Sequence, residues 1–315
     1  GSIAVQLIAP LAERLLASGL LTVLGGALAT RLNLDQPGEA IRSVEVRCKA
    51  TGRSSVVDDV DAVVLAVGAK GMHALMAESP RCSDVLPELA AAGGLGAIDV
   101  VSVRLWLDRT IAVADPANVF SRFDALQGAG ATFFMLDQLQ NADLDALWGG
   151  SEPQGSVVAS DFYNATAIAA LSDQEIVDTL LKELLPQAVP AFRLAQVVEC
   201  EGRRYPGSVS LFSPGRFSQR PPLQTALPSV VCAGDWVRMG EREHGAKGLC
   251  QERAYLARPF DSAPFDKLRT SWRRSMVLRT PFVCAQRTLA GCLRSAQGDT
   301  YKNGPICAII GRLCL

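Results

Sequence analysis

The feature that most constrains this chain is an apolar run that stops at an Ala-Gly-Asp-Trp sequence. Residues 231–237 predict a buried strand that ends at Asp235, and residues 244–255 predict a glycine-bearing loop that enters a helix. A carboxylate at a strand's carboxyl end can accept hydrogen bonds from sugar or ribityl hydroxyls, and glycines let the backbone approach a ring closely. The helix N-terminus favours a phosphate or an anionic ring. The pattern predicts a cofactor site, with an ordinary strand-loop-helix crossover as the alternative.

These residues resemble the C-terminal flavin-contacting motif of the FAD-dependent amine oxidase and phytoene desaturase superfamily, and more narrowly its carotenoid desaturase and isomerase branch. The resemblance extends through residues 98–108 and 205–215 and covers most of residues 1–257. It implies FAD as the cofactor, an apolar carotenoid-like substrate that is desaturated or isomerised, and a location in a plastid. The cofactor-binding positions that it implies are Ala29, Gly234, Asp235, Trp236, Gly245, Ala246 and Gly248.

No residue is assigned as catalytic, because hydride removal from a polyene depends on orientation and on the electronics of the flavin. The resemblance also implies that the inserted sheet forms a substrate cavity. Arg104, Trp106 and Tyr163 could line that cavity or could lie on an exposed strand face, and the sequence leaves both interpretations open.

The glycine-rich turn that holds the FAD pyrophosphate in this superfamily, Gly-x-Gly-x-x-Gly, does not occur in the sequence. The nearest candidate begins at Gly94, but it lacks the third glycine and precedes a strand-like run, so we interpret it as a loop. The start of the chain resembles the middle of a family member. We therefore expect a fragment, a truncated product or a protein without the first cofactor-binding half, in which FAD binding is weak or lost.

The composition places the chain among globular proteins and limits its partners. The hydrophobic fraction is 49%, the charged fraction is 20%, and the formal net charge of −1 predicts no general affinity for nucleic acid. The longest run without a charge, residues 15–30, is too short for a transmembrane helix. The nine cysteines are scattered without a Cys-x-x-Cys pair and the chain has only two histidines, so we expect no metal site.

Hydrophobic patterns predict an α/β region at the start of the chain. Leucines and Ile3 recur at helical spacing over residues 3–15, and residues 20–34 predict a turn and a strand near Gly25. Residues 44–48 alternate as a half-exposed strand does. The strand predicted at residues 61–67 is continuously apolar after Asp61 and leads through a glycine turn into a helix, which is typical of a strand that is buried on both faces.

The pattern changes near residue 95. Residues 101–107 alternate, and strand-like runs follow at 131–136, 156–162 and 195–200. Ser172 and Glu175 form a capping box that begins a helix, and Pro186 is expected to end it. We interpret this region as an antiparallel sheet with a covering helix.

The predicted fold class is α/β (α+β): a Rossmann-like FAD-binding domain, incomplete at its N-terminus, with an inserted antiparallel-sheet substrate domain. The predicted domains are the middle part of the FAD-binding domain at 1–94, the substrate-type domain at 95–227, a return to the first domain at 228–257, and a divergent tail at 258–315.

The tail carries ten basic residues against three acidic ones, an excess of seven positive charges. Such a segment could dock on an acidic partner or on an anionic membrane surface, or it could lack defined structure. Two functions therefore stay open. One is a FAD-dependent oxidoreductase or a part of one, and the other is an inactive relative that serves as a structural or interaction subunit of a plastid (thylakoid) membrane complex, with peripheral membrane contact.

Overall fold

The computed structural model describes residue 6 and residues 8–19, 21–36, 40–120, 123–140, 144–240, 276–279 and 308–311. The chain divides into two compact units, which we describe separately. One consists mainly of Ala97–Val209, and the other combines Ile3–Gly96 with Ser210–Leu315. The domain boundaries expected at residues 95 and 227 stay a prediction.

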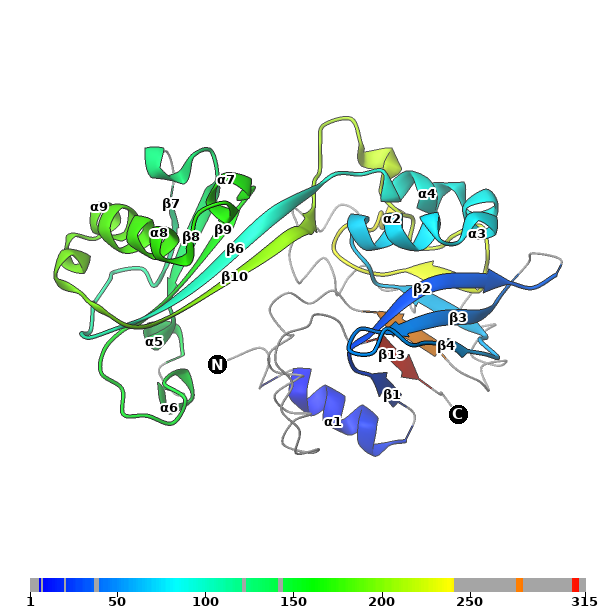
Figure 1. Ribbon diagram of the computed structural model, residues 1–315, viewed down its shortest axis with the longest axis horizontal. Helices are drawn as coiled ribbons and strands as arrows, with labels where there is room; N and C mark the ends of the chain where they lie inside the picture. The colour runs from blue at the N-terminus through cyan, green and yellow to red at the C-terminus, as the bar shows by residue number, and fades with distance from the viewer. Residues whose placement is uncertain are drawn as a thin grey trace. The chain divides into compact units, whose positions relative to one another are not determined.

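The unit that combines Ile3–Gly96 with Ser210–Leu315 contains a mixed sheet and a small antiparallel sheet (Figure 1). In the mixed sheet the strand order is β1 (Leu21–Leu24), β13 (Ala308–Gly311), β12 (Met276–Arg279), β5 (Ala62–Leu65) and β11 (Val230–Cys232). Strand β5 is parallel to both β11 and β12, whereas β13 is antiparallel to its two neighbours. The antiparallel sheet joins β2 (Ala27–Leu34), β3 (Ile41–Cys48) and β4 (Ser54–Val57).

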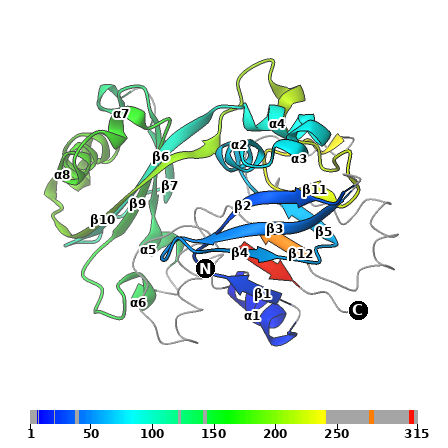
Figure 2. The same ribbon diagram turned by 45° about the vertical axis from the view of Figure 1, so that its right-hand side comes forward.

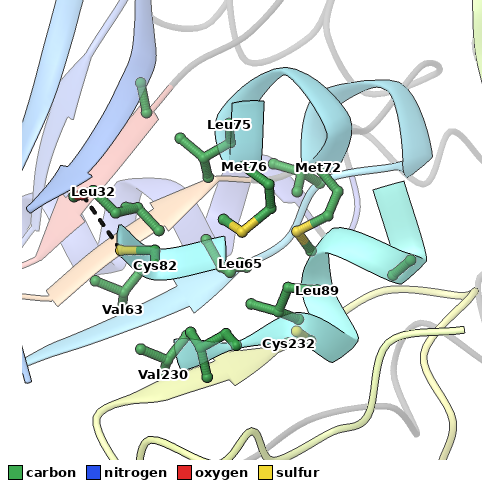
Figure 3. Packing of buried hydrophobic residues seen from close by; sticks show 14 of the residues in the cluster. Leu32, Val63, Leu65, Met72, Leu75, Met76, Cys82, Leu89, Val230 and Cys232 are labelled. Carbon is green, nitrogen blue, oxygen red and sulfur yellow. Dashed lines mark hydrogen bonds between the residues drawn. The ribbon is translucent and has the colours of Figure 1, made fainter. Parts of the chain in front are cut away.

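Helices α2 (Ala69–Ala77), α3 (Pro80–Val85) and α4 (Pro87–Gly93) lie together in this unit (Figure 2), and α1 (Ala9–Ala17) precedes β1. The apolar side chains of α2, α3 and α4 form one core with strands from both sheets. Figure 3 shows Met72 and Leu89 facing Leu65 of β5 and Cys232 of β11. Every residue of β5 is buried, as expected for a continuously apolar strand in a parallel pair.

The other unit is built on a five-stranded sheet with the order β10 (Val197–Ser210), β6 (Ala97–Leu107), β9 (Val157–Tyr163), β8 (Gly130–Met135) and β7 (Ala117–Phe120). The ladders β6–β9, β9–β8 and β8–β7 are antiparallel, as predicted. Val101, Val103 and Leu105 point to one face, where the helical segment around Leu180 and Leu184 covers them. Short helices α5 (Leu136–Leu139), α6 (Leu144–Leu147) and α7 (Thr166–Ala169) and the 3-10 turns Asp124–Leu126 and Pro190–Leu194 complete the described part.

The covering helix begins as predicted but does not end at Pro186. Ser172 and Glu175 form the capping box that begins α8 (Asp173–Asp178). A π-helical stretch, Thr179–Leu184, then leads into α9 (Leu185–Ala188), where proline occupies the first turn. The N–H groups of a helix's first turn have no partner within that helix, so a proline there costs no hydrogen bond. Because the π-helical stretch ends at Leu184 and a new α-helix begins at Leu185, Pro186 falls in a first turn and the chain stays helical.

Strand β10 is also longer than the predicted run of residues 195–200. It continues to Ser210 through Pro206 and Gly207. The φ of Gly207 is 56°. Because β10 is an edge strand of its sheet, one side of its backbone needs no ladder partner, and proline is tolerated there.

Candidate cofactor site

The candidate site lies where the parallel strands β5 and β11 end. Val230, Val231 and Cys232 pair with Val63, Val64 and Leu65, and the Ala233 amide donates to the Leu65 carbonyl oxygen at 3.1 Å. The carboxyl ends of both strands therefore reach the same edge of the sheet, where ligands bind in open α/β sheets. Helix α2 begins four residues after β5, with Gly68 as its N-cap, and the Ser210 hydroxyl accepts from the Ala69 amide at 3.4 Å.

The loop after β11 turns sharply at Gly234, whose φ is 128°. A Cβ at this position would be 3.5 Å from the Trp236 ring, an ordinary contact, so the backbone conformation rather than lack of space requires glycine. Asp235 is half-buried, whereas Trp236 and Val237 are buried at 2% and 0% exposure. The buried Trp236 ring thus fixes the loop to the core, while Asp235 remains partly exposed at the surface of the loop.

Cys232, the last residue of β11, belongs to the core and not to the site chemistry. It is completely buried among apolar side chains. Burial raises the pKa of the Cys232 thiol, and the negative charge of Glu88 raises it further. A neutral thiol at this position packs as a small apolar residue.

Ala29 lies on β2 and is buried in the same core cluster that contains Trp236. It pairs with Val46 of β3, and the next pair is Arg31 with Glu45, so Thr30 is an extra residue in the ladder. Such a bulge leaves local backbone groups outside the regular pairing. The expectation that the Ala29 backbone faces an adenine stays a prediction.

The three remaining predicted positions, Gly245, Ala246 and Gly248, lie outside the described residues. The structure therefore brings together Gly234, Asp235 and Trp236 on one loop, with Ala29 in the same core.

Sequence reasoning missed Arg220, which contacts this loop directly. Its Nε donates to the Trp236 carbonyl oxygen at 2.7 Å, and its Nη2 donates to the Asp235 carbonyl oxygen at 3.4 Å. The only local signal was an arginine in a segment that also contains phenylalanines, Phe212 and Phe217. That signal does not specify a partner 16 residues away, so a single sequence could not have identified the contact.

The described residues fit a flavin cofactor in chemical type. The half-buried Asp235 carboxylate is an acceptor for a cofactor hydroxyl, and it follows a glycine in a conformation that other residues rarely adopt. No three His, Cys, Asp or Glu side chains in the described part are grouped as metal ligands would be. Likewise, no helix there is long and apolar enough to cross a membrane.

The chain belongs to the family of flavin containing amine oxidoreductases, whose model matches residues 7–246. The carotenoid phi-ring synthase of Streptomyces griseus is 28% identical over 184 residues, which are 56% of this chain and 32% of that protein. The chain thus spans about a third of this curated relative.

Solved structures that match part of this chain include an oxidoreductase from Methanosarcina mazei, 14% identical with a TM-score of 0.48, over 78% of this chain and 49% of that one. Another is the cyclohexylamine oxidase of Brevibacterium oxydans, 14% identical with a TM-score of 0.42, over 76% and 48% of the two chains. Family membership and the sheets described above confirm the predicted family and the α/β fold class with an antiparallel sheet.

Proposed function

We propose that this protein is a FAD-dependent oxidoreductase, or a part of one, that desaturates or isomerises an apolar, carotenoid-like substrate. The observation that carries the proposal is the loop after β11, where Gly234 at a φ of 128° precedes a half-buried Asp235 at the carboxyl edge of a parallel strand pair. This loop lies within the part of the chain that matches the flavin-containing family.

In this proposal Asp235 accepts a hydrogen bond from a hydroxyl of the cofactor. Trp236, buried in the core, holds the loop in place, and the backbone of Ala29 contributes to the adenine end. When bound, a flavin supplies an acceptor for the hydride that desaturation removes. The tasks of the protein are then to bind the cofactor, to orient the substrate and to exclude water.

For the substrate we propose the face of the antiparallel sheet opposite the covering helix. Arg104, Phe134, Ala159 and Tyr163 share this face by strand register and are not fully buried. Trp106 is on the same face, but it is only 8% exposed and its Nε1 donates to the Leu147 carbonyl oxygen at 2.8 Å. Trp106 is therefore packed into the sheet and contributes little exposed surface. The half-buried side chains of Arg104, Phe134 and Ala159 provide the contact area for a substrate.

The carotenoid-like character of the substrate is supported by the name of the Streptomyces griseus relative and by the apolar residues at the Trp106 end of this face. Further along the same face the register places the polar residues Ser102, Thr132 and Asp161. Phe134 and Ala159 present apolar surface, and the Arg104 guanidinium lies 5.7 Å from the Trp106 ring centre, where its charge is partly balanced by the ring. An apolar polyene needs such a surface more than it needs hydrogen-bond donors.

The test is a titration with FAD, because the missing glycine-rich turn predicts weak binding that the colour of the purified protein would not reveal. We expect saturable binding, and we expect Asp235→Ala to weaken it roughly ten- to a hundredfold, since a hydrogen bond to a charged group is worth about 1.5–3 kcal/mol. The secondary structure of the variant, measured by circular dichroism, should stay unchanged.

The matched control is Asp173→Ala, at an acidic residue of the other unit, which should leave the FAD titration unchanged. Absence of any FAD binding would overturn the proposal and favour the inactive relative. Loaded protein should then convert an acyclic carotene in the presence of an electron acceptor, as followed by chromatography.

A further inference from the structure

The segment before β11 runs alongside the candidate loop and is bonded to it repeatedly. The Cys232 amide donates to the Leu223 carbonyl oxygen at 3.0 Å, and the Arg238 amide donates to the Pro221 carbonyl oxygen at 2.8 Å. The Arg238 Nε donates to the carbonyl oxygen of Arg220 at 2.8 Å. The backbone of Arg220 is therefore fixed next to the loop.

The guanidinium of Arg220 is oriented from both sides. It lies 4.6 Å from the ring centre of Phe212 and 5.2 Å from that of Phe217. From this position it donates to the successive carbonyl oxygens of Asp235 and Trp236, at 3.4 Å and 2.7 Å. Aromatic rings shield such bonds from water, and the planar guanidinium of arginine holds two donors in a fixed geometry, whereas the single ammonium group of a lysine does not.

We propose that Arg220 is a positioning residue for cofactor binding, which holds the carbonyl groups of Asp235 and Trp236 and so aims the Asp235 carboxylate. This inference rests on the proposed function, in which Asp235 binds a flavin hydroxyl. Within the loop, the Val237 amide donates to the Gly234 carbonyl oxygen at 3.4 Å. Removal of the guanidinium takes away both of these bonds to the loop.

The experiment compares FAD affinity in Arg220→Met, Arg220→Lys and the control Arg216→Met. Arg216 is exposed in the same segment, and its Nη1 donates to Gln219 Oε1 at 3.0 Å. We expect Arg220→Met to weaken FAD binding about tenfold, Arg220→Lys to restore part of that loss, and Arg216→Met to stay within about twofold of the parent. All titrations are made well below the melting temperature of each variant.

A double-mutant cycle separates positioning from a general structural role. If Arg220 acts through Asp235, Arg220→Met should weaken binding little further once Asp235→Ala is present. Additive losses would overturn the inference, because they would mean that Arg220 stabilises the fold independently of the carboxylate. The visible circular dichroism of bound flavin at saturating FAD should change in Arg220→Met and return towards the parent in Arg220→Lys.

A further variant guards against failure of Arg220→Met to fold. Phe217 is 51% exposed, so Phe217→Ala should fold while removing one ring from the guanidinium. We expect a smaller loss of FAD affinity, about two- to threefold. If the Arg220 and Phe217 variants bind FAD like the parent while Asp235→Ala does not, this inference fails and the proposed function stands. If Asp235→Ala also binds like the parent, the proposed placement of the cofactor fails as well.

Discussion

Strands β5 and β11 are buried on both faces, whereas β6 alternates between buried and half-buried residues from Val101 to Leu105. A strand that is buried on both faces has no exposed side chain along its length, so only the residues at its end can contact a ligand. The sheet that contains β6 is buried on one face only, so side chains on its other face can contact a ligand. The difference explains why the candidate cofactor loop follows a strand end, while the proposed substrate surface is a sheet face.

The largest expected effects come from shortening adjacent residues in the two kinds of strand. In β5, both Val64→Ala and Leu65→Ala should destabilise the protein, by about 1–3 and 2–5 kcal/mol, because neighbours on both faces are buried. In β6, Leu105→Ala should cost a similar 2–5 kcal/mol, but Arg104→Ala on the opposite face should cost under about 1 kcal/mol. Urea unfolding monitored by circular dichroism measures all four.

A cost for Arg104→Ala as large as that for Leu105→Ala would break the comparison. It would mean that the face we assign to the substrate is part of a second, fully packed core.

The next effect tests the strand end itself. Gly234→Ala places a Cβ at a φ of 128°, which other residues rarely adopt, and we expect a loss of about 1–3 kcal/mol in stability and weaker FAD binding. Gly25→Ala is the control, because a Cβ there meets nothing within 4 Å. Thermal melts paired with FAD titrations give the answer, and equal behaviour of the two variants would show that the turn at Gly234 is not required.

A smaller effect concerns the helix that covers the antiparallel sheet. Ser172→Ala removes the side chain that accepts from the Glu175 amide and should cost about 1 kcal/mol, with no change in FAD affinity. Ser172→Asp, which retains an N-cap acceptor, should recover most of the stability. A parallel loss of FAD binding would indicate that the two regions are coupled, contrary to the comparison.

Local rules predicted the parts of this molecule in which near neighbours decide the structure. The box of Ser172 and Glu175, the alternation in β6 and the apolar run of β5 each depend on spacing within one element, and the structure contains all three. The passage of the helix through Pro186 was missed because a π-helical stretch depends on how the helix packs. The extension of β10 through Pro206 was missed because its place at the sheet edge is set by distant strands.

The candidate site divides in the same way. Gly234 and Asp235 could be recognised from a short motif, but Arg220 acts through carbonyl oxygens 15 and 16 residues away, and no pattern in one sequence encodes that pairing. The plastid location, the membrane or protein partners and the cofactor roles of Gly245, Ala246 and Gly248 stay predictions.

The smallest expected effect is a pH dependence at the end of β6. The side chain of Arg109 donates to the Asp108 carboxylate at 2.9 Å, and the Gln196 amide donates to it at 2.8 Å. The hydrogen bond from Arg109, followed by that from Gln196, lowers the pKa of Asp108 from 3.8 to about 2. Because the pKa is lower in the folded state, the ionised carboxylate contributes stability above about pH 4, and this contribution is lost as the pH falls towards 2.

Asp108→Asn should therefore remove part of the decrease in melting temperature between about pH 4 and pH 2, while Asp115→Asn, at an exposed carboxylate of the same unit, should leave the decrease unchanged. Both side chains of the Asp108–Arg109 pair are partly exposed, so added salt should weaken the effect. FAD binding near neutral pH should be the same in both variants. A pH profile of Asp108→Asn that matches the parent would show that the link between β6 and Gln196 does not depend on the carboxylate charge.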